Sequence, residues 1–142
     1  MSLTTRYRIR IQWADCDAAR RVHYPNYFRL FDCSTHNLFE QAGLPLPVLL
    51  SDGTLHGLPI VDARARFRKS CVWGDWIEVE SHVAEWGRTS MTLQHRIWRG
   101  DEMLVEGHEV RVWSVPDPED PEKGCTSPIP DAIRDRFAGA AA

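Results

Sequence analysis

The chain has 142 residues, of which 43% are hydrophobic and 26% charged, and its formal net charge is −3. This length and composition are typical of one globular domain with a real core, not of two domains or a disordered segment. The acidic balance gives no electrostatic reason to expect a nucleic-acid partner, because such binders usually carry a basic excess.

The sequence also gives no sign of a membrane span or of a disulfide framework. No apolar run approaches the roughly 20 residues that a helix needs to cross a bilayer, and residues 1–5 lack the apolar core of a signal peptide. The four cysteines are widely separated, without a Cys-x-x-Cys pair, which argues against a zinc site and against disulfides. We therefore expect a cytoplasmic protein with free thiols.

The first predicted element is a half-buried strand over residues 7–13, where apolar side chains alternate with polar ones at Tyr7, Ile9, Ile11 and Trp13. A helix is predicted over 26–42, because apolar residues then recur at close to helical spacing. Proline at position 25 suits the first helical turn, where its missing N–H would have no partner. Gly43 and Pro45 mark the helix end, and the connection 45–57 is expected to be irregular or partly helical.

The second half of the chain is predicted to form four strands. Each alternates with a period of two, and the apolar positions are Val61, Ala63, Ala65 and Phe67; Ile77, Val79 and Val83; Met91, Leu93 and Ile97; and Val110 and Val112. Turn signals at 73–75, 87–88 and 100–101 predict an antiparallel meander, which the long helix would cover.

These elements predict an α+β fold in a single domain, 1–142, with one long central helix wrapped by a strongly bent, five-stranded antiparallel sheet. The proline-rich segment 116–130 is expected to be exposed, and 130–137 to form a short C-terminal helix.

The loop between the first strand and the helix carries groups suited to acyl transfer. A carboxylate, Asp15 or Asp17, precedes a helix N-terminus whose free amides can stabilise an oxyanion. Because proline has no N–H, the available amides are those of Tyr24, Asn26 and Tyr27. The carboxylate would attack a carbonyl or activate water. Alternatively, both aspartates only form turns or cap the helix.

A second pair in the same loop is Cys16 and His23. A cysteine with one nearby histidine is a weak signal for a nucleophile, and a small buried thiol is the more common role.

Residues 17–27 read Asp-Ala-Ala-Arg-Arg-Val-His-Tyr-Pro-Asn-Tyr, and this run resembles the signature of 4-hydroxybenzoyl-CoA thioesterases and related hotdog-fold acyl-CoA thioesterases. The similarity extends to Gly43-Leu44-Pro45, to Pro59-Ile60-Val61, to the run Glu-Trp-Gly-Arg-Thr-Ser at 85–90, and to Ile129-Pro130. It implies hydrolysis of a small aromatic or short-chain acyl-CoA to free acid and CoA.

The resemblance implies specific roles for the loop. Asp17 would be the nucleophile or general base, and the Tyr24 N–H would polarise the thioester carbonyl. Coenzyme A is part of the substrate, so no cofactor is expected. The resemblance further implies a homodimer or homotetramer with active sites at the subunit interface.

The resemblance also implies a set of substrate-binding residues. Arg88, Thr89 and Ser90 lie in the hairpin that resembles the CoA-contacting region, although Arg88 is equally an exposed hairpin charge. Asp32 would face the acyl group, unless it is only a polar residue of the helix surface. The full set is His23, Asn26, Tyr27, Asp32, Leu58, Ile60, Val61, Arg88, Thr89 and Ser90.

Three positions depart from the family pattern. His23 stands where tryptophan or tyrosine is common, and it could touch the acyl group, orient Asp17 or face solvent. Arg20 stands where the loop usually has glycine, which is favoured where the backbone needs a positive φ. Leu58 stands where a hydroxyl-bearing residue would help to recognise a phenol. Arg20 therefore favours an alternative function, a non-catalytic hotdog protein that binds an acyl thioester or serves as a structural subunit.

A metal site is not expected from the histidines that recur at His82, His95 and His108. Strand alternation places His95 on the apolar face and His82 on the polar face, so one ion could not be bound by all three. The basic run at 64–69 is most simply a solvated strand face.

Overall fold

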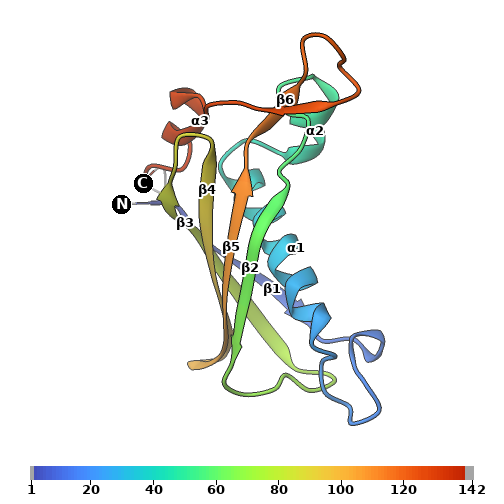
Figure 1. Cartoon of the computed structure of the whole chain (residues 1–142). Coiled ribbons are helices and arrows are strands. Elements are labelled where there is room, and N and C mark those ends of the chain that lie inside the picture. The colour runs from blue at the N-terminus through green and yellow to red at the C-terminus, as the bar shows by residue number, and fades with distance from the viewer. Residues whose placement is uncertain (1, 140–142) are drawn as a thin grey trace.

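The computed structural model describes residues 2–139, and its main features are one long helix and one curved sheet (Figure 1). The sheet has five strands in the order β1-β3-β4-β5-β2, and all neighbours are antiparallel. This confirms the predicted α+β fold class. The elements are β1 (Thr4–Arg10), a 3-10 turn (Trp13–Asp15), α1 (Pro25–Gln41), α2 (Leu46–Ser51), β2 (Ile60–Phe67), β3 (Trp76–Trp86), β4 (Ser90–Arg99), β5 (Glu102–Val112), β6 (Ser114–Pro116), β7 (Gly124–Thr126) and α3 (Asp131–Asp135).

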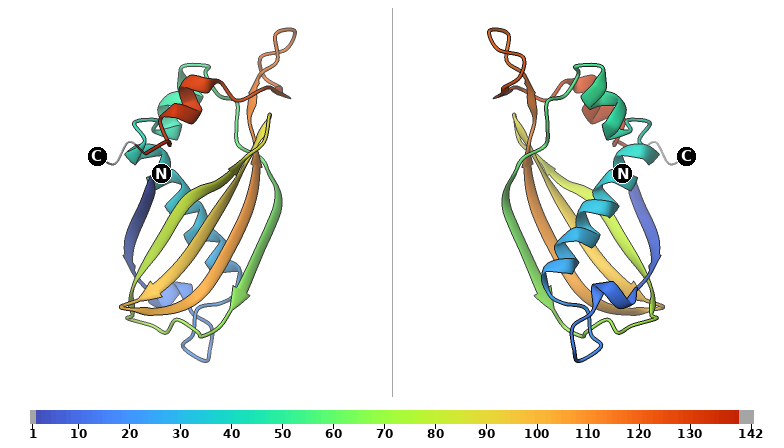
Figure 2. Two further views of the ribbon diagram at one scale, coloured as in Figure 1. Left: turned by 90° about the vertical axis from the view of Figure 1, so that its left-hand side faces the viewer. Right: turned by 90° about the vertical axis from the view of Figure 1, so that its right-hand side faces the viewer.

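The helix α1, of 17 residues, lies inside the curve of the sheet (Figure 2). Its first residue is Pro25, as expected from the sequence. The face turned to the sheet buries a continuous stripe: Tyr27, Leu30, Phe31, Ser34, Thr35, Leu38 and Phe39. The strands contribute the inward-facing Ile77, Val79, Met91, Leu93 and Ile97. Burying this apolar stripe, at about 25 cal/mol per Å² removed from water, is the main force that holds helix and sheet together.

The position of β2 differs from the predicted meander. Strands β3, β4 and β5 follow one another, but β2 pairs with β5 at the far edge of the sheet, with Ala63 opposite Glu109. Alternation along a strand defines its faces and carries no information on its neighbours, so the prediction placed β2 wrongly beside β3. As an edge strand, β2 leaves Val61 and Phe67 largely exposed.

Two further expectations were wrong at strand ends and faces. The first strand stops at Arg10, and Trp13 lies in the 3-10 turn with 60% of its surface exposed. In β5 the buried face carries Glu109 and Arg111, whereas Val110 is only partly buried. The prediction therefore assigned the wrong face of β5 to the core. Charged side chains can be buried where other groups in the core form hydrogen bonds or ion pairs with them.

The chain after β5 forms a small hairpin of β6 and β7 and then α3. Most of the segment 116–130 lies at the surface, but Ile129 is buried, as are Ile133 and Phe137 near α3. The Arg136 side chain donates hydrogen bonds to the carbonyls of Ala42 and Gly43 and so ties this segment to the end of α1. No helix within residues 2–139 is both long and apolar enough to span a bilayer.

Candidate active site

The loop that joins β1 to α1 is a closed turn anchored to the connection before β3. The Asp17 N–H donates to the Arg21 carbonyl at 2.9 Å, and the Arg20 N–H donates back to the Asp17 carbonyl at 2.9 Å. Two further bonds attach the loop to its neighbour, from Val22 to the Cys71 carbonyl and from Trp73 to the Arg20 carbonyl. The backbone of the loop is therefore held by main-chain bonds at both of its ends.

Arg20 adopts the left-handed backbone conformation, with φ of 64°, and is the only described non-glycine residue that does so. This conformation costs an L-residue with a Cβ about 1–2 kcal/mol. The loop thus keeps the geometry for which glycine is the usual choice. The substitution of arginine is accommodated as backbone strain and does not refold the loop.

The two aspartates of the loop have different environments. Asp15 is buried, and its carboxylate accepts hydrogen bonds from the Gln12 N–H at 2.8 Å and from Arg29 Nη2 at 2.6 Å. Asp17 is exposed, and its carboxylate accepts one bond, from the Ala19 N–H at 2.9 Å. Asp15 is therefore committed to the structure. Asp17 is the carboxylate that retains free acceptor positions.

The amides at the start of α1 can be distinguished in the same way. The Asn26 N–H donates to the His23 carbonyl at 2.9 Å, and the Tyr27 N–H donates to the Tyr24 carbonyl at 3.2 Å. Within residues 2–139 the Tyr24 N–H donates no hydrogen bond. It lies at the positive end of a 17-residue helix, where an unpaired N–H can stabilise a developing oxyanion. Of the three candidate amides, only that of Tyr24 is free.

Asn26 and Tyr27 were predicted to bind substrate, but their side chains serve the fold. Asn26 Nδ2 donates to the Asp15 carbonyl at 2.8 Å. The Tyr27 hydroxyl accepts the Cys71 N–H at 3.1 Å, and its ring is buried in the core. Burial raises the pKa of Tyr27 to about 12, so the hydroxyl stays protonated. This placement argues against a Tyr27 side chain that touches substrate.

Cys16 and His23 do not form a nucleophilic pair. The Cys16 thiol lies near the Gln12 carbonyl, and burial, together with the charges of Asp15, Asp17 and Asp75, raises its pKa. A thiol held protonated is a poor nucleophile. The His23 ring is exposed and packs edge-on against Tyr24, with centroids 5.3 Å apart.

Further along α1, Asp32 is bound by an arginine that the sequence did not single out. Arg111 Nη2 donates to Asp32 Oδ1 at 2.9 Å and to Glu109 Oε2 at 3.1 Å. His36 Nε2 lies 3.8 Å from the second oxygen of Asp32. The side chain of Asp32 is half exposed, whereas Arg111 and Glu109 are buried.

A chain of buried polar groups continues from Glu109 into the core. His95 Nε2 lies 2.6 Å from Glu109 Oε1, and His95 Nδ1 lies 2.6 Å from the Ser81 hydroxyl. The Ser81 hydroxyl lies 2.6 Å from that of Ser34. The His95 ring is fully buried and stacks on Phe31, with centroids 4.8 Å apart. We call Ser34, Ser81, His95, Glu109 and Arg111 the buried polar chain.

The buried polar chain accepts two proton arrangements. If His95 is neutral with its proton on Nε2, Ser34 donates to Ser81, which donates to His95 Nδ1. If Nδ1 carries a proton, it donates to the Ser81 hydroxyl, and Ser81 then donates to Ser34. Ser34 in turn donates to the Val79 carbonyl, 3.2 Å away. Both arrangements leave each hydrogen of Ser34, Ser81 and His95 with an acceptor, which is the condition for burying such groups, whereas Arg111 Nε stays buried without one. Sequence reasoning placed His95 correctly on the inner face but missed its partners.

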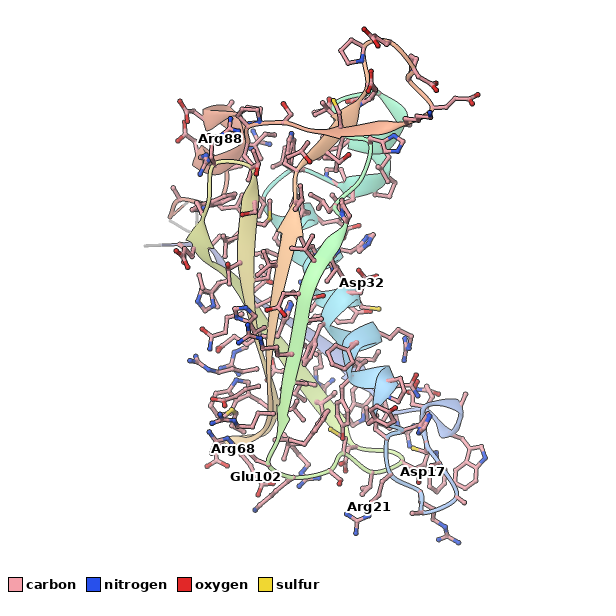
Figure 3. The ribbon with its side chains drawn as sticks, in the orientation of Figure 1. Asp17, Arg21, Asp32, Arg68, Arg88 and Glu102 are labelled. Carbon is pink, nitrogen blue, oxygen red and sulfur yellow. The ribbon has the colours of Figure 1, made fainter. Side chains whose placement is uncertain are left out.

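The remaining predicted residues lie away from the Asp17 loop. Figure 3 shows Arg88 at the opposite end of the sheet from Asp17, with Asp32 between them. Thr89 and Ser90 neighbour Arg88 in the same hairpin, and Ile60 and Val61 are exposed on the edge strand β2. Leu58 lines a small pocket with Arg111. Within one chain, the structure does not bring these residues together with Asp17.

No group of three or more metal-ligating side chains is found among the described residues. His82 pairs with Gln94 on the outer face of the sheet, whereas His95 points inward. An exposed aromatic pair that the sequence did not predict, Trp13 and Trp73, packs edge to face beside the loop, with centroids 5.6 Å apart.

Comparison with known proteins gives consistent results. The profile of the thioesterase-like superfamily matches residues 11–137. A 4-hydroxybenzoyl-CoA thioesterase from Pseudomonas sp. (strain CBS-3) is 35% identical over 117 residues, which cover 78% of this chain and 82% of the relative. The solved structure of 4-hydroxybenzoyl-CoA thioesterase from this strain superimposes with a TM-score of 0.82 at 28% identity, covering 94% of this chain and 98% of the other. A gentisyl-coenzyme A thioesterase superimposes with a TM-score of 0.81 at 29% identity, covering 94% and 99%. These structural neighbours confirm the predicted fold.

Proposed function

This chain belongs to the thioesterase-like superfamily, and we propose that it hydrolyses the thioester of an acyl-CoA to the free acid and coenzyme A. The acyl group is small and aromatic or short-chain, because the relatives above are named as thioesterases of 4-hydroxybenzoyl-CoA and gentisyl-CoA. The observation that carries the proposal is the free carboxylate of Asp17 in one loop with the unpaired Tyr24 N–H.

These two groups support two routes to the same products. In one, Asp17 takes a proton from water, and the hydroxide adds to the carbonyl carbon. In the other, the carboxylate itself adds, CoA leaves as thiolate, and water hydrolyses the resulting anhydride. In both routes the Tyr24 N–H stabilises the negative oxygen, and the departing thiolate takes up a proton. Because either route needs only water, we propose that the enzyme uses no cofactor.

The alternative, a non-catalytic hotdog protein, rested on Arg20. Its φ of 64° shows that the loop keeps the conformation for which glycine is usual, so this feature no longer favours the alternative. The free carboxylate of Asp17 supports the catalytic function.

We propose that the active site is completed by a second copy of the chain, in a homodimer or homotetramer. Arg88 and Asp17 lie at opposite ends of one chain (Figure 3), so a CoA molecule that meets both spans two subunits. The edge strand β2 exposes Ile60, Val61 and Phe67, which is the kind of apolar edge that native proteins cover. The four free cysteines fit the expected cytoplasmic location.

The test is a CoA-release assay over benzoyl, hydroxybenzoyl, phenylacetyl and short aliphatic thioesters, with the variant Asp17→Asn. Asparagine keeps the Oδ1 that accepts the Ala19 N–H, so the loop is expected to stay folded. We expect turnover to fall by about 10²- to 10⁴-fold.

The matched control is Asp52→Asn, because Asp52 is also exposed and accepts a backbone N–H, from Thr54, at 2.9 Å. It should leave turnover unchanged. Wild-type protein that releases no CoA from any thioester would contradict the proposed function, and full activity of Asp17→Asn would contradict the role of Asp17.

A further inference from the structure

Asp15 is the residue through which α1 holds the loop that carries Asp17. Its carboxylate accepts a hydrogen bond from Arg29 Nη2, in the second turn of the helix, at 2.6 Å. Its main-chain carbonyl accepts another from Asn26 Nδ2, in the first turn, at 2.8 Å. The Asp15 side chain is 11% exposed and that of Arg29 is 48% exposed. Two helix side chains therefore hold one residue of the loop, two positions before Asp17.

The same carbonyl of Asp15 fixes the peptide group that contains the Tyr24 N–H. It accepts the His23 N–H at 2.9 Å, and the His23 carbonyl accepts the Asn26 N–H at 2.9 Å. The His23 C=O and the Tyr24 N–H belong to one planar, trans peptide unit, so they point in opposite directions. Because the carbonyl points along the helix, the Tyr24 N–H points out from the helix N-terminus. The direction of this oxyanion donor thus depends on where Asp15 lies.

We propose that Arg29 and Asp15 are positioning residues, and that their ion pair sets the direction of the Tyr24 N–H. The inference rests on the proposed thioesterase function. Arg29 forms no ion pair with another described residue, and the only other donor to the Asp15 carboxylate is the Gln12 N–H, at 2.8 Å. A buried carboxylate that loses its cation turns toward water, because one N–H does not replace its hydration. Asp15 then shifts, and the peptide group that it holds shifts with it.

Steady-state kinetics of Arg29→Met test the proposal, since methionine keeps an extended side chain and removes the charge. An interaction that acts only in the transition state lowers kcat and leaves KM nearly unchanged. A misplacement of about 1 Å can cost about 10²-fold, so we expect kcat to fall by about 10- to 100-fold. Arg29→Lys keeps a cation near Asp15 and should recover most of kcat. The matched control is Arg68→Met, because Arg68 is 49% exposed and pairs at 3.2 Å with Glu106, outside the loop.

A double-mutant cycle separates positioning from a direct contact between Arg29 and substrate. Asp15→Asn removes the charge that Arg29 binds, so adding Arg29→Met to it should change kcat by less than about twofold. The same fall in kcat in both backgrounds, or a rise in KM without a loss of kcat, would overturn the proposal. So would a kcat of Arg29→Met within about twofold of the wild type. If Arg29→Met alone does not fold, the comparison of Asp15→Asn with the double variant decides.

The direction of the Tyr24 N–H can also be measured without turnover. Phenacyl-CoA is a ketone that the enzyme cannot hydrolyse, and a hydrogen bond to its carbonyl lowers the C=O stretching frequency in isotope-edited infrared spectra. We expect this frequency, for the bound ligand, to be higher in Arg29→Met than in the wild type and unchanged in Arg68→Met. Equal frequencies in the wild type and Arg29→Met would refute the positioning role. Because no bond is broken, this result stands apart from a failure of the CoA-release assay.

Discussion

Replacing Glu109 by leucine removes the central acceptor of the buried polar chain. The Glu109 carboxylate is 1% exposed and accepts from His95 at 2.6 Å and from Arg111 at 3.1 Å. Hydrogen bonds to a charged group contribute about 1.5–3 kcal/mol each, and removing one member of a buried ion pair costs about 3–5 kcal/mol. Arg111 keeps Asp32, and leucine regains some apolar contact, so we expect a loss of about 4 kcal/mol in the free energy of unfolding.

Urea denaturation followed by tryptophan fluorescence measures this loss at a fixed protein concentration, since the chain has six tryptophans. A loss of about 4 kcal/mol corresponds to a fall in Tm of roughly 10–15 °C for a domain of this size. Glu109→Gln is the matched variant. Its amide can donate to His95 Nε2 and accept from Arg111 if the His95 proton moves to Nδ1. We therefore expect it to lose only about 1–2 kcal/mol.

The pH dependence of the Glu109→Leu effect follows from the pKa of Glu109. Burial alone would raise this pKa, but the hydrogen bond from His95 and the charge of Arg111 outweigh burial and lower it. A carboxyl with a lowered pKa stabilises the fold fully above its unfolded pKa of about 4.3 and loses that contribution as the pH falls through its folded pKa. The wild-type advantage should thus be largest at pH 7 and shrink below about pH 4. An advantage under about 1 kcal/mol at pH 7, or one that grows on acidification, would refute this account.

Three further substitutions have expected outcomes in the same denaturation assay. Arg20→Gly should raise the free energy of unfolding by about 1 kcal/mol, because it relieves the strain at φ of 64°; an unchanged Tm would contradict this. Tyr27→Phe should lose about 1–3 kcal/mol, because it leaves the buried Cys71 N–H without an acceptor, while the KM for thioester stays the same. A raised KM would mean that the hydroxyl meets substrate. Gly107→Ala should lose about 1–3 kcal/mol, since its Cβ would overlap the Phe31 ring that stacks on His95; wild-type stability would show that the ring moves freely.

The local features of this fold were predictable because local chemistry determines them. Pro25 indicated the start of α1, and alternation identified the buried faces of β3 and β4, including the inward direction of His95. The pairing of β2 with β5 was not predictable in this way. A strand can pair with any free edge, and only the length and path of the connection 68–75, which carries the chain across the end of the sheet, decided between the edges.

In the candidate site, too, the residues of one local loop were predictable, whereas contacts between distant parts of the chain were not. Asp17 and Tyr24 were identified from the loop signature, and the structure then separated Asp17 from Asp15 and the Tyr24 amide from its neighbours by their hydrogen bonds. Glu109 and Arg111 were missed because a hydrophobicity pattern assigns charged residues to solvent. Yet one signal for them was present.

A histidine on an apolar strand face needs polar partners, since an unpaired buried imidazole would lose its hydrogen bonds to water. His95 is such a residue, and its partner must come from an inner position of a neighbouring element. In β5, the strand after β4, the inner positions near His95 are Gly107, Glu109 and Arg111, and only the last two are polar. The need of His95 for a hydrogen-bond partner therefore predicts that the face of β5 with Glu109 and Arg111 is buried, although a hydrophobicity pattern predicts the opposite face. Burial of that face turns Arg111 inward, where it binds Glu109 and Asp32 and lines a small pocket with Leu58.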